Sequence, residues 1–461
     1  MNKMILGCAA CLLAAVPVLA APSAQDPASD LFKERVEVDG EKISIKQAID
    51  LALQDSYQII DAAKTREIYQ AKLQEARASF YPTVSLSGTY GRALKKARMP
   101  LGDTLLEVGK NNTFSAAAGL DYILWSGGQV RNNAKLAGVQ AEESLYQYKH
   151  TQSLVTQQVV KFCYDIIYAS ALIRVQEEYL DIAKQHLAET RARYREGLSS
   201  NLDVLNQKVQ VENIEPQVMQ AKKNFELGNL YLRQILNRDP EDGIYLTWTE
   251  KDLRVPPTPP LDELYALAMK YRPELVMSKL AVEAAHYSIQ LAKSGHMPVL
   301  ALTADYSYNA YTDHGFPQHR NQYYWASNAG LSLNIPLFEG FKISSRVTQQ
   351  ELAYEQAVAA YKNRLKNVRI QVKDAYLNLE EAKSRIEATR GVVQQARENL
   401  NAQMLRYRNG LSSRLELNDA TANVNDSDLQ YVQAVYDAVI ALSDLRYAVG
   451  VEVSLYEKKD N

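Results

Sequence analysis

The pattern of apolar and polar positions divides the chain into two kinds of segment. In two long stretches, apolar or neutral residues recur at alternating spacings of three and four positions, from Leu145 to Tyr194 and from Val358 to Tyr407. Such a repeat, which averages about 3.5 residues, is the seam of a coiled coil. Seams of this kind are most often found in rods and oligomerisation stalks, so the pattern alone predicts long packed helices but no function.

Proline, which would break a helix, is missing from both stretches. None lies between positions 101 and 215, and none follows Pro336. The pattern therefore predicts helices from about Gly128 to Tyr194 and from about Gly340 to Tyr407. Each would be about 100 Å long at about 1.5 Å per residue, which exceeds the size of a compact domain.

A short phrase of small and polar residues ends both stretches. It is YREGLSS from Tyr194 and YRNGLSS from Tyr407, 213 positions later, which indicates a tandem duplication. Gly197 and Gly410 suit the left-handed residue that ends a helix, and the serine pairs offer N-caps for the next helix. Each long helix is therefore expected to turn back on itself.

The remaining helices follow from the same duplication. The returning helices are expected from about Asn201 to Leu236, with a local bend at Pro216, and from about Arg414 to Val449. A further helix is expected at the start of each half, from about Ser44 to Ser79 and from about Leu261 to Lys293. The result is two helical hairpins with matching tips.

Four segments instead alternate apolar and polar residues with a period of two, as strands do when their two faces meet different surroundings. A soluble sandwich would give the same alternation. Strand lengths of about ten residues and aromatic side chains near the strand ends favour a β-barrel in a membrane. The segments are Val84 to Tyr90, Phe114 to Leu124, Leu300 to Tyr308 and Trp325 to Ile335, with the aromatic residues Tyr90, Tyr306, Tyr308, Tyr323, Tyr324 and Trp325.

Four strands cannot close a barrel, because a closed barrel needs at least about eight. Several chains are therefore expected to share one barrel. The connections between paired strands, Lys95 to Asn112 and Tyr311 to Gln322, are polar and long enough to be external loops. Pro82 and Pro298 mark the entrances to the first strand of each pair.

The first twenty residues have the features of a secretory signal peptide. Lys3 supplies a positive start, an apolar stretch runs from Met4 to Val16, and small residues precede Ala21. Residues 1–20 are thus expected to be removed. The mature chain then has one cysteine, Cys163, which is expected to be a buried hydrophobic residue. A first repeat is expected over 21–254, a proline-rich linker over 255–260 and a second repeat over 261–461.

Composition excludes several functional classes. The chain has 52 Lys and Arg against 54 Asp and Glu, which gives no support for nucleic-acid binding. It contains no glycine-rich phosphate loop, no nucleophile elbow and no zinc-protease motif. Two histidines lie together only in an expected external loop, at His314 and His319. We therefore expect neither an enzyme, nor a bound metal, nor a cofactor.

The ordered recurrence of these features resembles the TolC family of outer-membrane efflux proteins over essentially the whole mature sequence. The resemblance implies an α+β membrane protein that forms a homotrimer. Its twelve-stranded β-barrel, with four strands per chain, would sit in the lipid of the outer membrane of a Gram-negative bacterium. The barrel would continue into a long α-helical coiled-coil barrel in the periplasm.

The resemblance also implies partners and a docking site. A periplasmic adaptor (a membrane fusion protein) and an inner-membrane pump of the RND, ABC or MFS type would load small molecules, such as drugs and toxic compounds, for export. Adaptor docking is carried over to the residues of the two tips. These are Gly197, Leu198, Ser199 and Ser200 in the first tip and Gly410, Leu411, Ser412 and Ser413 in the second.

A periplasmic gate is implied in the same way. The acids that ring the entrance in the family match Glu416 and Asp419, which are three apart and share one helix face. The latch tyrosine matches Tyr407, and its acidic acceptor on the other hairpin matches Asp203. One departure is visible, because Ser412 occupies the position where some relatives carry a latch arginine. Arg414 is the nearby candidate to replace it.

Two other functions remain open from the sequence. A protein-secretion duct of the type I systems would have the same fold, because a passive tunnel takes its specificity mainly from the pump. A periplasmic coiled-coil adaptor or structural rod would explain the heptads and the export signal, but it would leave the four alternating strands without a purpose.

Overall fold

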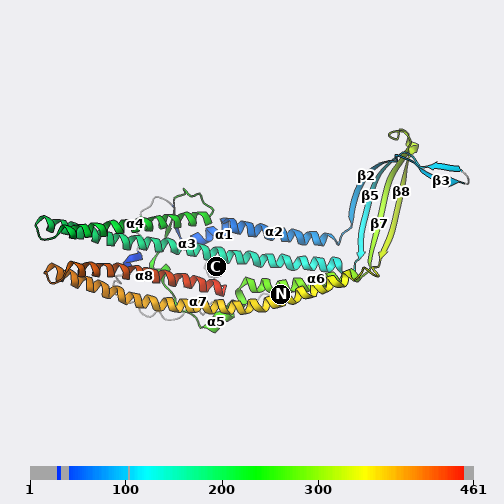
Figure 1. Ribbon diagram of the computed structural model, residues 1–461. Coiled ribbons are helices and arrows are strands. Elements are labelled where there is room, and N and C mark those ends of the chain that lie inside the picture. Colours follow the sequence, from blue (N-terminus) through cyan, green and yellow to red (C-terminus); the bar gives the residue numbers. More distant parts are fainter. Residues whose placement is uncertain (1–28, 33–40, 102–103, 451–461) are drawn as a thin grey trace, which may run out of the picture.

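The chain folds into a long helical body with a sheet at one end, as shown by a computed structural model (Figure 1). The structure describes residues 29–32, 41–101 and 104–450. The expected signal peptide, residues 1–20, lies outside the described residues. The sheet and the turns of the two helical hairpins occupy opposite ends of the body, so the full length of the helices separates them (Figure 1).

The two hairpins confirm the predicted helices almost to the residue. In the first hairpin, α3 covers Gln129–Arg195 and α4 covers Asn201–Ile235. In the second hairpin, α7 covers Lys342–Arg408 and α8 covers Arg414–Val449. Both long helices have 67 residues, because neither contains a proline to end it earlier. Pro216 lies inside α4, which continues through it.

The prediction of a single helix at the start of each half is wrong, because two helices occupy each of these segments. The first half has α1 (Ile45–Asp55) and α2 (Tyr57–Ala78), and the second has α5 (Leu261–Tyr271) and α6 (Pro273–Lys293). The residues between them, Ser56 and Arg272, are extended. Ser56 caps α2 by accepting a hydrogen bond from the backbone N–H of Ile59. Arg272 precedes a proline, which disfavours the helical conformation.

Four long strands form one antiparallel sheet in the order β2-β5-β7-β8. Pro82 and Pro298 come directly before β2 and β7, as expected. The register aligns like faces, since Leu86 lies opposite Ala118, which in turn lies opposite Tyr306. The apolar side chains therefore gather on one face and the polar ones on the other. The strand bounds are Thr83–Arg92 for β2, Asn112–Trp125 for β5, Val299–Thr312 for β7 and Tyr323–Asn334 for β8.

Two small sheets were not expected from the sequence. A parallel pair joins β1 (Glu41–Ser44) to β6 (Ile244–Thr247) beside the helical body. An antiparallel pair, β3 (Ala97–Leu101) and β4 (Thr104–Val108), makes a hairpin inside the segment expected to be an external loop. Figure 1 shows that this hairpin projects from the end of the sheet that is far from the helices. Four short 3-10 turns cover Ser29–Phe32, Glu250–Leu253, Ser294–His296 and Arg320–Gln322.

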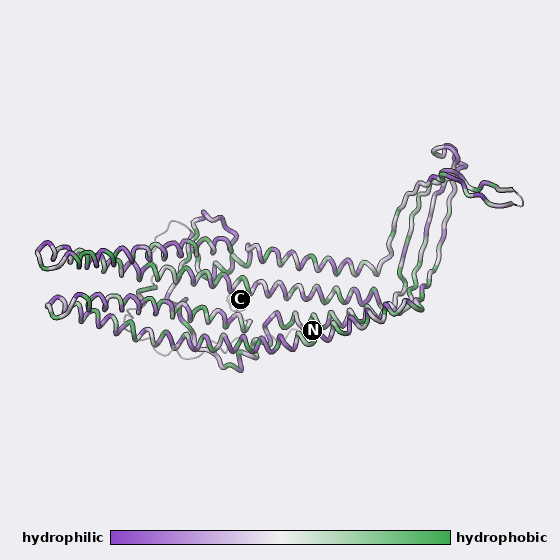
Figure 2. Tube along the Cα trace, in the orientation of Figure 1, coloured by the Kyte–Doolittle hydropathy of each residue, from purple (hydrophilic) through white to green (hydrophobic). Residues whose placement is uncertain are grey.

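The hydrophobic core lies inside the helical body and not in the sheet. One cluster joins α1, α3, α4 and α8 through residues such as Ile49, Val159 and Leu232. A second cluster joins α5, α7 and α8 through Val372 and Ala438, where small residues let the helices approach closely. Cys163 is buried in the first cluster, as expected. Figure 2 shows apolar positions alternating with polar ones along the long helices, which is the pattern of the predicted seam.

Within the described residues, none of the helices combines the length and the apolar character required to cross a lipid bilayer.

Candidate functional site

Each hairpin turns through a Schellman motif at its tip. In the first tip Gly197 has φ of 74°, and the N–H of Leu198 donates to the carbonyl of Arg193 at 2.9 Å. In the second tip Gly410 has φ of 70°, and the N–H of Leu411 donates to the carbonyl of Arg406 at 2.8 Å. Only glycine adopts these angles without strain, so the expected role of both glycines is confirmed.

Serine side chains then start the returning helices, also as expected. Ser200 Oγ accepts from the N–H of Asp203 at 3.1 Å, and Ser413 Oγ accepts from the N–H of Glu416 at 3.3 Å. Each acid reaches back to the N–H of its serine, which completes a capping box. The tips are therefore rigid turns whose conformation is fixed by local hydrogen bonds.

Leucines make the tips apolar as well as hydroxyl-rich. Leu198 and Leu411 are 72% and 70% exposed, and Leu202 and Leu415 are 65% and 70% exposed. Sequence reasoning named the first two but missed Leu202 and Leu415. Their signal was present, because each is the second residue of a returning helix and stands beside the tip phrase.

The two capping acids at the tips have lowered pKa values. Hydrogen bonds from the side chain and backbone of Ser200, and from Ser199, hold the pKa of the Asp203 carboxyl below its ordinary value. Hydrogen bonds from the side chain of Ser412 and the backbone of Ser413 do the same for Glu416. Both side chains are therefore negative at neutral pH. Asp419 is exposed on the same side of α8.

All these bonds use one oxygen of each acid. Ser199 and Ser200 donate to Oδ2 of Asp203, at 2.7 to 3.0 Å. Ser412 and the N–H of Ser413 donate to Oε2 of Glu416. No described residue donates to the other carboxylate oxygen of either acid. Each acid is thus anchored and still has one oxygen for a partner outside this chain.

Tyr407 joins the two hairpins near their tips, but not through Asp203. Its hydroxyl accepts from Nη1 of Arg193 on α3 at 2.7 Å and from Nη1 of Arg414 on α8 at 3.3 Å. Both guanidinium groups also lie over the Tyr407 ring, at 5.0 and 5.9 Å from its centroid. Within the described chain the Asp203 carboxylate is committed to its capping box and forms no hydrogen bond with Tyr407.

Arg414 extends this link back to the first hairpin. Its Nη2 donates to the backbone carbonyl of His186 on α3 at 2.9 Å. His186 is buried, and burial together with the nearby Arg414 charge lowers its pKa. The imidazole is therefore neutral at neutral pH and does not repel the arginine. Arg193, Tyr407, Arg414 and His186 thus form one connection among α3, α7 and α8, which we call the tip latch.

A second polar connection ties the hairpins together far from the tips. Tyr436 on α8 donates to Asp165 on α3 at 2.6 Å, and Tyr168 on α3 donates to Gln433 on α8 at 2.6 Å. The rings of Tyr168 and Tyr436 lie 4.7 Å apart. This connection lies within the packed body, whereas the tip latch joins the two hairpins near their ends.

The described residues offer no group of three or more His, Cys, Asp or Glu side chains placed to hold a metal ion. The expected external histidines, His314 and His319, belong to no such group. What the tips present is a surface made of exposed leucines, hydroxyls and anchored acids.

Comparison with known protein families matches most of the chain to one family. The sequence profile of the family described as outer membrane efflux protein matches residues 48–238 and 264–451. The chain is 23% identical over 405 residues to the outer membrane protein TolC of Vibrio cholerae, covering 87% of this chain and 89% of that protein. It is 24% identical over 403 residues to TolC of Escherichia coli, covering 84% and 78%.

Solved structures share the fold. The outer membrane channel CmeC of Campylobacter jejuni superposes with a TM-score of 0.76 at 18% sequence identity, and the match covers 94% of both chains. At this identity the similarity concerns the arrangement of hairpins and sheet. Each of the two segments matched by the family profile contains one helical hairpin.

Proposed function

This chain belongs to the outer membrane efflux protein family, and we propose that three copies form one channel for the export of small molecules. It is an efflux channel of the outer membrane of a Gram-negative bacterium, with its helical body in the periplasm. In the proposed assembly each chain supplies four strands to a twelve-stranded barrel. The coiled-coil rod considered from the sequence is set aside, because it gives no role to the sheet.

The observation that carries this proposal is the sheet with two free edges. In the order β2-β5-β7-β8, the outer edges of β2 and β8 have no partner among the described strands. On its apolar face, Val84 and Leu86 are 76% and 85% exposed, although aliphatic side chains of this size are normally buried. Lipid would cover that face, and unpaired backbone groups cannot be left in lipid. Pairing β8 of one chain with β2 of the next removes both edges.

The mature protein in mild detergent is therefore expected to be a homotrimer. Its mass can be measured by native mass spectrometry or by light scattering after size-exclusion chromatography. Boiling should release monomers, because the trimer is held by hydrogen bonds and packing without a covalent link. A stable monomer with the circular dichroism of the folded protein would contradict the proposal.

We further propose that the tips dock a periplasmic adaptor, which connects the channel to an inner-membrane pump. Exposed leucines next to exposed hydroxyls suit the apolar seam of another helical hairpin. The docking residues are the tip residues expected from the sequence together with Leu202 and Leu415. The rigid Schellman turns would present this surface in a fixed shape, so that little conformational entropy is lost on docking.

Gly197→Pro and Gly410→Pro are each expected to abolish pump-dependent efflux and to leave trimer assembly intact. Proline cannot adopt φ near +70°, and it removes the N–H that bonds to the end of the long helix. Efflux is measured as survival of cells exposed to a pump substrate, with trimer recovered from the outer membrane as the control. Gly391→Ala, at a helical glycine with open space around it, is the matched benign change. Normal efflux by both proline variants would place docking elsewhere.

The gate is proposed from the same geometry. Glu416 and Asp419 of three chains would gather six carboxylates around the threefold axis, which would favour cations over anions at the entrance. The free oxygen of Asp203 is available to accept a hydrogen bond from the neighbouring subunit, while the tip latch holds Tyr407 within each chain. In this proposal Asp203 and Tyr407 both hold the entrance closed. Asp203 does so by bonding to the neighbouring subunit, and Tyr407 by bonding to Arg193 and Arg414 of its own chain.

A further inference from the structure

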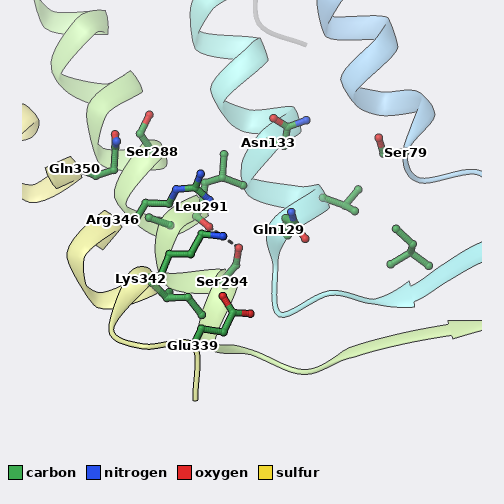
Figure 3. Close-up of a pocket in the computed structure, with 15 residues that line it drawn as sticks. Ser79, Gln129, Asn133, Ser288, Leu291, Ser294, Glu339, Lys342, Arg346 and Gln350 are labelled. Atoms are coloured by element: carbon green, nitrogen blue, oxygen red, sulfur yellow. Dashed lines mark hydrogen bonds between the residues drawn. The ribbon is translucent and has the colours of Figure 1, made fainter. Parts of the chain in front are cut away.

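A cavity of about 710 Å³ lies where the sheet meets the helical body, far from the tips. Its walls come from the ends of α2, α6 and β5 and from the beginnings of α3 and α7 (Figure 3). Cavities of this size accommodate small organic molecules. The tip latch and the proposed gate do not account for it.

Two cations line this cavity without an acidic partner. Lys342 and Arg346 are four residues apart on α7 and so lie on one face of the helix. Figure 3 shows both side chains extending from α7 toward α6, on the side where Ser294 lies. No described carboxylate forms an ion pair with either. By contrast Lys293, close by on α6, is paired with Glu351 at 3.0 Å.

Glu339 is the acidic residue of the lining, so each cavity has two positive charges and one negative charge. The other polar lining residues are neutral amides and hydroxyls. These residues are Ser79, Gln129, Asn133, Ser288, Ser294 and Gln350. The hydroxyls of Ser288 and Ser294 already donate to the carbonyls of Ala284 and Leu291, so the donors left for an oxyanion are the amides and Ser79.

Two helices begin at the cavity and add to its positive potential. Gly128 precedes α3 and Phe341 precedes α7, and neither supplies a side-chain cap to its helix. At α3, however, Ser126 Oγ accepts from the N–H of Val130 in the first turn, at 3.4 Å. Of the two, the N-terminal end of α7 is therefore the one without a side-chain oxygen from a described residue. A helix end alone would not make a site, but here the end of α7 reinforces two side-chain charges in a partly open cavity.

The register of the sheet shows on which of its two faces, polar or apolar, the cavity lies. Ile123 lines it, and Ile123 lies opposite Ala301 on β7. Two positions along the same face, Asp121 lies opposite Thr303. The cavity is thus on the polar face of the sheet, which faces the channel and not the lipid in the proposed barrel.

We propose that this cavity binds small organic anions bearing a carboxylate or phosphate group as they pass along the channel. Lys342 and Arg346 supply the charge, and the amides of Gln129, Asn133 and Gln350 supply hydrogen bonds. The site in the channel wall rests on the proposed trimeric channel, whereas anion binding by the cavity does not. Because both cations are exposed, binding is expected to be weak and to weaken further with added salt.

Calorimetric titration of the detergent-solubilised protein with inorganic pyrophosphate at low ionic strength tests the site. The double variant Lys342→Gln with Arg346→Gln is expected to weaken binding at least about tenfold, because it removes both attracting charges. Glu339→Gln should instead tighten binding by about two- to fivefold, since it removes the repelling charge. Lys293→Gln, which changes a paired lysine outside the cavity, should have no effect.

An unchanged affinity in the double variant, or no binding to the wild-type protein, would overturn the proposal. Circular dichroism and trimer mass of each variant show whether it is folded, and the opposite sign expected for Glu339→Gln cannot arise from misfolding. In a planar bilayer, pyrophosphate should reduce the conductance of the wild-type channel more than that of the double variant. Calorimetric binding without any channel formation would refute the proposed function and leave the cavity as an anion site.

Discussion

Ala329→Lys is expected to prevent most of the protein from assembling in the outer membrane, whereas Asn328→Lys is expected to be tolerated. The two residues are neighbours on β8 but lie on opposite faces of the sheet. Ala329 lies opposite Ala304 on the apolar face, and Asn328 lies opposite Asp305 on the polar face. A lysine in contact with lipid near the middle of a bilayer costs about 2 to 4 kcal/mol. Three chains per barrel repeat that cost three times.

In the control variant, Asn328→Lys, the new lysine would have Asp305 as a favourable partner. Asn328 Nδ2 donates to the carboxylate of Asp305 at 3.1 Å, so a lysine at position 328 would place its charge beside that acid. The measurement is the amount of heat-sensitive trimer recovered from outer membranes of cells that express each variant at equal levels. Equal recovery of both variants would contradict the assignment of the two faces, and with it the proposed barrel.

The sequence was sufficient for the features that depend on local periodicity. The apolar repeat of α3, like that of α7, runs without an interrupting proline. The length of each helix could therefore be predicted from the number of residues in the repeat. Gly197 and Gly410 stand where the seam ends, and a helix that must reverse there needs a residue with positive φ. The strands were found because one face meets lipid and the other does not, which forces a strict alternation.

Features that depend on pairing between distant segments were not accessible. The strands β1 and β6 have four residues each and are about 200 positions apart, so neither shows a pattern of its own. The hairpin of β3 and β4 was missed because Pro100 lies within β3, and proline normally argues against a strand. In a two-stranded hairpin each strand is an edge, so one missing donor is tolerated.

The sequence contains signals for the breaks between α1 and α2 and between α5 and α6, but the apolar periodicity favoured an unbroken helix. Arg272 precedes Pro273, which by itself favours a break, and Ser56 is a typical N-cap residue. The apolar spacing continues across both positions, so periodicity alone favoured one helix. The two short helices that precede the breaks pack in separate core clusters, α1 in the first and α5 in the second.

The tip latch could be predicted only in part. The position of Tyr407 and the proximity of Arg414 followed from the tip phrase, but Arg193 is 214 positions from Tyr407 in the sequence. No local pattern connects the two. Asp203 presents a different difficulty, because its position in the sequence is compatible with two roles. It can complete a capping box, or it can accept a hydrogen bond from the latch tyrosine. In the described chain the capping box engages its side chain.

Arg414→Ala is expected to shift the channel toward its open state, because Arg414 bonds to both Tyr407 and His186 in the tip latch. Its guanidinium donates to Tyr407 and to the His186 carbonyl, at 3.3 and 2.9 Å, and thereby holds α8 against both α7 and α3. After screening by solvent, such contacts are worth about 1 kcal/mol per chain. If three chains open together, about 3 kcal/mol would change the ratio of open to closed channels about a hundredfold.

The measurement is single-channel conductance of the purified trimer in a planar bilayer, where the variant should spend more time in a high-conductance state. Arg408→Ala is the matched control, because Arg408 follows Tyr407 directly but has no hydrogen bond or ion pair with a described residue. Tyr407→Phe should raise conductance less than Arg414→Ala, since it leaves the bond to His186 in place. An Arg414→Ala trimer with unchanged conductance would show that other contacts hold the entrance closed, and the latch would then be a packing feature of the hairpins.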